Sequence, residues 1–581
     1  MLWLLSCALI TEGDREQRMD NDGDGWELPQ DCDDGDDTVY PNRAEECNGI
    51  DDDCDGDVDE GLDVGAWYLD ADEDGYGDPE QGVDACEGPE GYVDNGDDCD
   101  DGEQFINPAA EELCNDGIDN NCFEDGKDCR LAGELSHLDA DAALFGSTEN
   151  GGVGWSIHAV PDLGPRNNAL VIGAPGWSGF TGSAYVVLEP KEGQQYAESG
   201  TAAIRGIEGS ELGFSIDHVP PLDGEGPELI LGAPGVDLES GRVYRVDTPV
   251  FGEVEITDIE GYVYGADKGV TLGYAVAGSG DLSGDGQPDI AISSPSASST
   301  YSAIDPGRVT VHDAALTEPV RDGDATGIVT SSSITALFGY AVEVADVDSD
   351  GADDLIVGAP YSSEGTAAGG EVSVFLGPIG VLDVDDRDAA IMPNWPGDNL
   401  GAALAADGDL NLDGYVDILV GAPGSSIGDP RAGVAALFTG PVDSGEAELS
   451  DAVVLVLGED GQSTSGCAQC VGGAVANLGD IDQDGYGDVA VGAGLYTRNG
   501  PTGSDPSAVL LYGGAQLGGT FDYTDSDLLI EGGRSSAFGG AVALAGDANA
   551  DGVLDLAVGA ATADGDETSS GAVFLFWGSA P

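Results

Sequence analysis

The nine residues DIDQDGYGD, 480–488, lie at the centre of the stretch VGGAVANLGDIDQDGYGDVAVGAG, 471–494, and this stretch decides the fold. Its clustered aspartates repel one another, so the loop costs free energy unless a cation lies among them. In a loop of the form DxDxDGxxD, positions 1, 3, 5 and 9 supply oxygen ligands, position 7 supplies its backbone carbonyl, and the glycine permits the sharp turn. The loop therefore predicts a calcium site, because calcium takes roughly six to eight oxygen ligands.

The same pattern recurs along the chain in seven copies. The first landmark of each copy is a glycine, and these glycines are Gly154, Gly213, Gly273, Gly339, Gly401, Gly472 and Gly539. Successive copies begin 59 to 71 residues apart, whereas a second landmark follows the first after 19 or 20 residues in every copy. The constant interval marks the core of the repeat, and the variable length belongs to surface loops.

Each copy reads as a set of short strands. An alternating segment such as GYAVEVAD precedes the acidic loop, and an apolar run such as DLIVGAP follows it. A third strand, as in GEVSVFLG, and a weaker fourth, as in DSDLLIEGG, complete the unit. Four strands per unit, with no helical periodicity, predict an all-β protein with a seven-bladed β-propeller over residues 131–581.

The last copy ends after GAVFLFWG and lacks a fourth strand. Residues 139–152, DADAALFGSTENGG, match residues 525–540 in position and character. We therefore expect residues near 141–147 to complete the last blade and close the ring, which removes exposed sheet edges.

Five copies carry a complete loop. The expected ligands, with position 7 acting through its carbonyl, are Asp281, Ser283, Asp285, Gln287 and Asp289 in blade three; Asp346, Asp348, Asp350, Ala352 and Asp354 in blade four; Asp409, Asn411, Asp413, Tyr415 and Asp417 in blade five; Asp480, Asp482, Asp484, Tyr486 and Asp488 in blade six; and Asp547, Asn549, Asp551, Val553 and Asp555 in blade seven. Position 7 varies freely, as a backbone ligand permits. The alternative for any single loop is a plain Asp-Gly turn.

The remaining differences between the copies predict unequal calcium binding. Blade three is expected to bind most weakly, because Ser283 replaces an acidic or amide ligand. Blade one, with Asp162 and then Arg166, has lost the pattern, and the loop of blade two around Asp223 and Glu225 is one residue short. We expect no calcium in blades one and two.

The paired FG and GAP landmarks around a DxDxDGxxD loop resemble the FG-GAP repeats of the integrin α-subunit propeller. The resemblance covers roughly residues 135–581 and rests on a fixed spacing that recurs in all seven copies. It implies an extracellular propeller with calcium in its hairpin loops and a role in recognition or adhesion.

Residues 19–130 form a second region, which is acidic and contains eight of the eleven cysteines, between Cys32 and Cys129. It repeats the calcium loop twice in full and once in part. The expected ligands are Asp51, Asp53, Asp55 and Asp59; Asp70, Asp72, Asp74 and Asp78; and Asp20, Asp22 and Asp24. Dense cysteines in a small acidic module indicate disulfides and an oxidising compartment.

Two cysteine units recur in this region, QDCDDGDDTVYPNRAEECNGIDDDC and DDCDDGEQFINPAAEELCNDGIDNNC. They resemble the MopE-type metal-binding repeat of bacterial surface proteins and also thrombospondin type 3 repeats, in which irregular backbone wraps calcium between disulfides. The second copy departs from the pattern at Asp119 and Asn121, because Phe123 stands where the fifth-position ligand should be. The module is expected to be ordered by metal and disulfides, with a disordered acidic spacer as the alternative, and the cysteine pairing stays open.

Charge restricts the partners. The chain has 17 Lys and Arg against 113 Asp and Glu, a net charge of −96. Nucleic acid and anionic membrane surfaces are therefore poor partners, because attraction to phosphate needs Lys and Arg. Self-repulsion of this size disfavours a compact state, so bound calcium is expected to offset it.

Residues 1–18 resemble the end of a bacterial lipoprotein signal, with Leu4-Leu5-Ser6 before Cys7. This resemblance implies lipidation of Cys7, a lipid anchor to a membrane, and an extracellular or cell-surface location such as that of an outer-membrane lipoprotein of a bacterium. The segment lacks a basic start and is short for a signal, so a mis-assigned start codon is the alternative. No apolar run reaches the roughly 18 residues of a membrane span.

Enzymatic chemistry finds little support. The four histidines, at 137, 158, 218 and 312, show no HxxxH or HxH spacing, and neither a GxSxG elbow nor a P-loop is present. A structural disulfide between Cys467 and Cys470 is favoured over a redox pair, because redox chemistry needs a strand-to-helix context. Paired aspartates of a glycosidase are indistinguishable here from calcium ligands.

The sequence therefore predicts a non-enzymatic, calcium-binding, cell-surface or secreted protein for adhesion or recognition of an unknown protein or glycan ligand. The alternatives are a structural surface-layer or matrix component, and a glycan-active hydrolase or lectin that uses a propeller face.

Overall fold

The computed structural model describes residues 20–62, 65–86, 88–110, 122, 131, 133–163, 168–222, 226–266, 268–296, 306–333, 335–364, 366–428, 431–442, 444–458, 470–481, 486–493, 508–512, 518–522, 525–533, 536–550, 552–565 and 567–578. The chain divides into two compact units, Met1–Asp128 and Cys129–Pro581.

The described residues of the first unit are mostly irregular backbone. Among them is one small antiparallel sheet, in which β1 (Gly65–Leu69) lies between β2 (Gly82–Ala85) and β3 (Tyr92–Val93). Disulfides join Cys32 to Cys54, Cys47 to Cys86 and Cys99 to Cys122. Val39 is the only buried apolar side chain among the described residues 20–110, so covalent cross-links take the place of a hydrophobic core in this unit.

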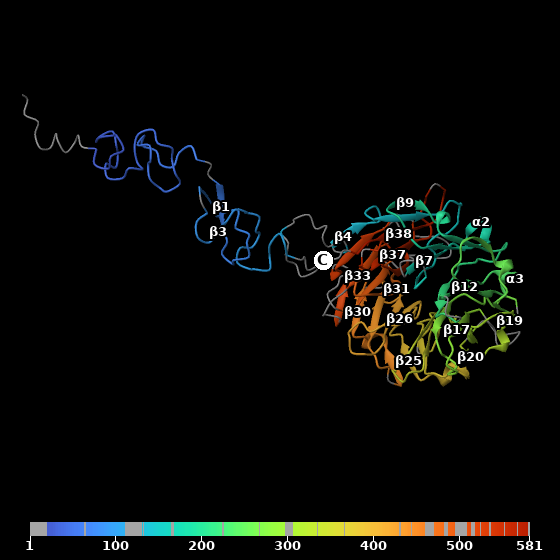
Figure 1. Cartoon of the computed structure of the whole chain (residues 1–581). Helices are drawn as coiled ribbons and strands as arrows, with labels where there is room; N and C mark the ends of the chain where they lie inside the picture. Colours follow the sequence, from blue (N-terminus) through green and yellow to red (C-terminus); the bar gives the residue numbers. More distant parts are fainter. Residues whose placement is uncertain are drawn as a thin grey trace, which may run out of the picture. The chain divides into compact units, whose positions relative to one another are not determined.

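The described residues of the second unit form seven five-stranded sheets, arranged as blades around a ring (Figure 1). The predicted all-β propeller is confirmed. Its two α-helices among these residues are short, α2 (Trp177–Phe180) and α3 (Val236–Glu239). None of the helices described is long or apolar enough to cross a membrane.

The strands of a blade follow one another outward from the ring centre. The inner strands are β6 (Ile157–Pro161), β11 (Ile216–Val219), β16 (Val276–Gly280), β21 (Ala341–Ala345), β26 (Ala403–Gly408), β31 (Val471–Gly479) and β36 (Phe538–Gly546). The second strands are β7 (Asn168–Gly173), β12 (Glu228–Ala233), β17 (Asp289–Ser294), β22 (Asp354–Gly358), β27 (Asp417–Ala422), β32 (Asp488–Ala493) and β37 (Asp555–Ala560). Inner strands of successive blades contact each other around the ring, and β36 contacts β6.

Two further antiparallel strands complete each repeat. The third strands are β8 (Ser183–Val187), β13 (Arg242–Val246), β18 (Arg308–Asp313), β23 (Val372–Phe375), β28 (Val434–Phe438), β33 (Ala508–Tyr512) and β38 (Ala572–Phe576). The fourth are β10 (Ala202–Arg205), β15 (Tyr262–Tyr264), β20 (Gly327–Thr330), β25 (Ala389–Met392), β30 (Val454–Leu457), β35 (Leu528–Glu531) and β5 (Ala142–Phe145).

A fifth strand, which the sequence did not predict, pairs in parallel with the fourth and comes from the next repeat. These strands are β14 (Gly252–Glu255), β19 (Val320–Arg321), β24 (Val381–Asp383), β29 (Gly445–Glu448), β34 (Gly519–Asp522), β4 (Gly133–Ser136) and β9 (Gly193–Tyr196). They are short and largely exposed, so they carry no apolar alternation from which a strand could be predicted. Each one joins two neighbouring blades through backbone hydrogen bonds.

The landmark glycines allow neighbouring blades to approach closely. A Cβ atom on Gly358 would lie 2.2 Å from the backbone oxygen of Gly401, and one on Gly421 would lie 2.1 Å from that of Gly472. The second landmark of one repeat thus packs directly on the first landmark of the next. This contact explains why the interval between the landmarks hardly varies.

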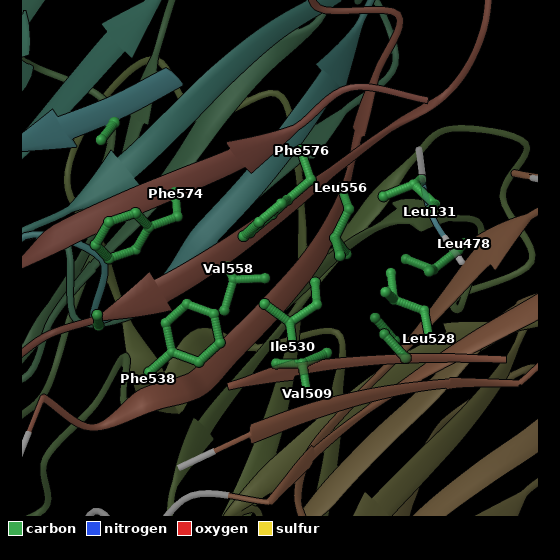
Figure 2. Close-up of a cluster of buried hydrophobic side chains, with 14 of the residues drawn as sticks. Leu131, Leu478, Val509, Leu528, Ile530, Phe538, Leu556, Val558, Phe574 and Phe576 are labelled. Carbon is green, nitrogen blue, oxygen red and sulfur yellow. The ribbon is translucent and has the colours of Figure 1, made fainter. Parts of the chain in front are cut away.

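Apolar side chains fill the space between blades. Phe538, Leu556 and Phe574 from the seventh blade pack with Val509 and Ile530 from the sixth (Figure 2). All five side chains are buried. Apolar contacts between blades therefore continue across the closure of the ring, where the seventh blade packs on the sixth.

Closure depends on the start of the second unit. β5 pairs antiparallel with β38, with Phe145 opposite Ala572, and so supplies the missing fourth strand of the seventh blade. The expectation that residues near 141–147 complete this blade is confirmed. β4 in addition supplies the fifth strand of the sixth blade.

We expect Leu144→Ala to destabilise the whole propeller, because Leu144 belongs to the closing strand β5, is only 2% exposed and packs in the core. The expected loss in the free energy of unfolding is about 2–5 kcal/mol. Urea unfolding measures it, with Leu138→Ala, at a side chain 81% exposed, as the matched control. Equal stability of the two variants would contradict closure through β5.

Candidate cation-binding loops

Each predicted calcium loop connects an inner strand to the second strand of its blade. The ninth-position aspartates Asp289, Asp354, Asp417, Asp488 and Asp555 are the first residues of β17, β22, β27, β32 and β37. All five are at most 2% exposed. The loops therefore occupy equivalent places, at one end of the inner strands.

The first-position aspartate shapes its loop. The two carboxylate oxygens of Asp346 accept hydrogen bonds from the backbone N–H groups of Asp350, at 3.1 Å, and Gly351, at 3.0 Å. Asp281 and Asp409 make the same pair of contacts in their own loops. A carboxylate oxygen that accepts one hydrogen bond keeps a lone pair for a cation, so this geometry is compatible with calcium.

The ninth-position aspartate does more than the sequence predicted. Oδ2 of Asp354 accepts a hydrogen bond from Val347 N, at 2.9 Å, and Oδ1 accepts one from Gly377 N, also at 2.9 Å. Gly377 lies just after the third strand, so one buried carboxylate joins the loop, the second strand and the third strand. Asp417 and Asp555 make the equivalent contacts in their blades.

Burial of these carboxylates is costly for the ionised form. It raises the pKa of Asp289 and of Asp354 to about 6, and it raises the pKa of Asp417, although backbone N–H groups that bond the carboxylates act in the opposite direction. A bound cation would stabilise the ionised form, because an opposite charge within a few ångströms lowers a carboxyl pKa.

Three of the loops also contact the next blade. The backbone oxygen of the second loop residue accepts a hydrogen bond from a backbone N–H of the following repeat. The pairs are Leu282 with Ile379 at 2.7 Å, Val347 with Val442 at 3.1 Å, and Leu410 with Gly487 at 3.2 Å. An ordered loop therefore helps to hold neighbouring blades together.

Several predicted residues lie outside the described part of the chain. They are Asp482, Asp484, Asp551, Cys467 and Cys7, together with Arg166, Asp223 and Glu225 of the first two blades and Asp119 and Asn121 of the second cysteine unit. In the sixth blade, Ile481 N still donates to Asp488 Oδ2 at 2.7 Å, as in the other loops. Cys470 is disulfide-bonded, but its pairing with Cys467 stays a prediction.

In the first unit, a DxDxDG loop lies against a later DCDD segment. Asn21 N donates to Asp34 Oδ1 at 3.1 Å, and Ala71 N donates to Asp101 Oδ1 at 2.7 Å. The segments DCDD at 31–34 and 98–101 are identical in sequence, so the two contacts are equivalent. The predicted loops are therefore completed by residues from elsewhere in the chain.

The DCDD segments bring buried carboxylates that the sequence did not assign as ligands. Asp98 is 2% exposed, and its Oδ2, like those of Asp72 and Asp74, is buried without a hydrogen-bond partner. Burial raises the pKa of Asp98, and the charges of Asp74 and Asp72 raise it further. Oxygen atoms oriented in this way fit a hard cation.

Asp20, Asp22 and Asp24 form an equivalent cluster with Asp31, which is 1% exposed. The DCDD motif that follows the loops at Asp20 and Asp70 was the sequence signal for these additional residues.

Two predicted ninth-position residues of the first unit accept hydrogen bonds from nearby groups. Asp59 accepts hydrogen bonds from Asn48 N and Gly49 N, both at 3.1 Å. Asp78 accepts from Glu80 N at 2.7 Å and from Gln81 Nε2 at 2.6 Å. In the loop that begins at Asp51, carboxylate oxygens of Glu45, Asp51 and Asp53 lie within 4.8 Å of one another. Glu45 is therefore close enough to bind the same cation as the loop.

An arc of aromatic rings lies at the other end of the inner strands. Trp155, Phe214, Tyr274 and Tyr340 each follow a first landmark glycine, in blades one to four. Successive ring centres are 5.1, 4.8 and 5.2 Å apart. Each ring is half-buried. Since every inner strand runs from its landmark glycine to its acidic loop, the arc and the loops lie at opposite ends of the strands.

Comparison with known families agrees with this geometry. The FG-GAP repeat family matches residues 272–312, 338–375 and 400–438, and each match contains one complete loop. A second family, described as "Putative metal-binding motif", matches residues 31–60 and 98–127. The chain thus carries FG-GAP repeats in its propeller and a metal-binding motif in its first unit.

The curated relatives are integrin α chains. Integrin alpha pat-2 of Caenorhabditis briggsae is 29% identical over 356 residues, which are 56% of this chain and 27% of the relative. Human integrin alpha-8 is 28% identical over 49% of this chain and 26% of its own, and human integrin alpha-D is 36% identical over 28% and 14%. The chain spans about a quarter or less of these relatives, and its propeller is integrin-α-like.

Among solved structures, one titled "Structure of Dos1 propeller" covers 77% of this chain and 94% of its own at 11% identity, with a TM-score of 0.34, too low to carry an argument.

A pair of variants separates the two roles of the loop carboxylates. Asp354→Asn replaces one acceptor with a donor that faces Val347 N or Gly377 N, so it should cost about 1–3 kcal/mol in chelator, and more in calcium because a predicted ligand charge is also lost. In the unaltered chain, Asp350 Oδ1 accepts a hydrogen bond from Ala352 N at 2.8 Å. Asp350→Asn keeps this acceptor but removes the charge, so it should cost stability only when calcium is present. Thermal unfolding in millimolar calcium and in chelator measures both. A cost of Asp350→Asn that is equal in the two conditions would mean that the loop is a turn and not a cation site.

The pH dependence of stability should reverse when calcium is added. Without metal, Asp289 and Asp354 bind protons more tightly in the folded state, because their pKa is about 6 instead of 3.8. Stability from these groups is complete below about pH 4 and is lost as the pH rises through 6. Calcium competes with protons for the carboxylates and should make the melting temperature rise between pH 5 and pH 7. The same pH profile in calcium-free and calcium-containing buffer would contradict this expectation.

Proposed function

We propose that this protein is a calcium-binding adhesion or recognition protein that is secreted or held at the cell surface. Calcium is structural and lies in the hairpin loops, while the opposite end of the inner strands binds a protein or glycan partner. The observation that carries this proposal is the arc of four half-buried aromatic rings at that end.

Half-buried aromatic rings of this kind suit recognition. Aromatic side chains are enriched at interfaces, because they bury a large apolar area at a low cost in conformational entropy. Here the rings stand on rigid strands, so little further ordering is needed on binding. The relatives support the same function, because they are integrin α chains.

Calcium is favoured over other hard cations by the donor set. The loops offer carboxylate, amide and carbonyl oxygens, and several of these are also held by backbone N–H groups in irregular loops. Calcium tolerates irregular geometry, whereas magnesium demands a near-ideal octahedron. The lipid anchor through Cys7 belongs to the same proposal and places the propeller at a membrane surface, as in an outer-membrane lipoprotein.

The test is binding of the full chain to arrays of glycans and surface proteins, in calcium and in chelator. We expect a ligand whose affinity falls at least tenfold, about 1.4 kcal/mol, in Phe214→Ala and Tyr274→Ala. The matched control is Phe251→Ala, at a side chain 64% exposed just before β14, and it should bind normally. Equal loss in all three variants would contradict recognition by the arc.

Two other outcomes would favour the alternatives. A calcium-stabilised chain that binds nothing on either array would favour a structural surface-layer or matrix component. Release of sugars from an array glycan would favour a glycan-active hydrolase.

A further inference from the structure

Two of the four histidines meet at the ring centre, although 60 residues separate them. His158 lies on β6 and His218 on β11, which are the inner strands of the first and second blades. The Nε2 atom of His158 is 2.9 Å from the Nδ1 atom of His218. Asp217 lies with them, its Oδ1 atom 3.2 Å from His158 Nε2 and 3.4 Å from His218 Nδ1.

These three distances fit the ligand atoms of one metal ion. Zinc binds imidazole nitrogen and carboxylate oxygen at about 2.0–2.2 Å in tetrahedral sites, and such bonds place the ligand atoms about 3.3–3.5 Å from one another. Two nitrogens and one oxygen at 2.9, 3.2 and 3.4 Å therefore form one face of a slightly compressed tetrahedron.

Hydrogen bonds account for part of this arrangement. One imidazole N–H can donate to the ring nitrogen of the other across 2.9 Å, and Asp217 Oδ1 accepts a bond from the backbone N–H of His218 at 2.7 Å. If both nitrogens were protonated, two N–H groups would face each other across 2.9 Å. A single cation in front of the three atoms attracts all of their lone pairs at once.

The surroundings hold the cluster in place and leave it reachable. Oδ2 of Asp217 accepts a hydrogen bond from Gly278 N of the third blade at 2.7 Å, and this contact fixes the carboxylate, as outer contacts of metal ligands do. The side chains of His158, Asp217 and His218 are 27%, 17% and 17% exposed, so an ion in solution can reach them.

A carboxyl group of the fourth blade holds the equivalent position in its repeat. Glu343 follows Gly339 by four residues, as His158 follows Gly154 and Asp217 follows Gly213, so the three hold the same place in their repeats. Burial raises the pKa of Glu343 well above its ordinary value, and the charges of Asp407 and Asp217 raise it further. A bound cation would favour the ionised form of this carboxyl group.

We propose that His158, Asp217 and His218 bind one divalent transition-metal ion of the zinc class. This site is distinct from the calcium loops, because imidazole nitrogen suits zinc, copper, iron and nickel, whereas calcium prefers oxygen. Three protein ligands leave at least one coordination position for water or an incoming ligand, as in sites that act on substrates. The inference does not depend on the proposed recognition function.

The test uses the full chain saturated with calcium, so that the acidic loops are filled. Equilibrium dialysis against Zn²⁺ should show one additional site that millimolar magnesium does not remove. His158→Ala and His218→Ala should each weaken zinc binding at this site at least 100-fold. His137→Ala, which removes a histidine outside the cluster, is the control and should bind zinc as the unaltered chain does.

A spectrum covers the case in which the cluster variants fail to fold. The unaltered chain loaded with Co²⁺ should show the intense visible bands of tetrahedral cobalt without a thiolate charge-transfer band. Zinc binding that is unchanged in His158→Ala and His218→Ala, or a cobalt spectrum that is octahedral or thiolate-dominated, would overturn the proposal.

Discussion

The propeller depends on a buried aspartate at the start of the second strand of a blade. Asp354, Asp417 and Asp555 each accept one hydrogen bond from the acidic loop and one from the residue that follows the third strand. A neutral amide of the same size has only one acceptor oxygen, so it could not accept both bonds. One carboxylate therefore supplies both acceptors for the backbone N–H groups, and the same carboxylate supplies negative charge for a cation.

This arrangement explains how a chain with a net charge of −96 can fold at all. Isolated buried carboxylates would be expelled or protonated, because burial disfavours the ionised form. Here many of them lie in small groups, each held by backbone N–H groups and each suited to one cation. In the first unit, grouped carboxylates are combined with disulfides. Almost no apolar side chain of its described residues is buried, so the disulfides replace a hydrophobic core.

Features that repeat with the period of the sequence were predictable. The landmark glycines, the complete loops and the strands around them depend on residues less than about 30 positions apart, so their pattern is visible in one copy and is checked by the others. The closing strand β5 was predictable for the same reason, because residues 139–152 match the fourth-strand segment of another repeat. The second role of Asp354 was not, since its partner Gly377 carries no side chain that could signal the contact.

Features that depend on contacts between repeats were not predictable. The fifth strands pair with a neighbouring blade and have no periodicity of their own, and the DCDD segments lie far along the chain from the loops that they complete. The contact between His158 and His218 could not be predicted from the spacing of histidines within one segment. His158 and His218 belong to different repeats, and only the ring brings their inner strands together.

The first two blades show what repetition allows. Their sequences have lost the calcium-loop pattern, yet their inner strands carry the histidines and the aspartate that meet at the ring centre. A closed ring can tolerate the loss of a loop in one blade, because each blade is also held by its neighbours through the fifth strand and the landmark glycines. Once a blade is held in this way, its inner strand is free to change. Equivalent positions from neighbouring blades face the same axis, so a few substitutions there are enough to build a site that no single repeat contains.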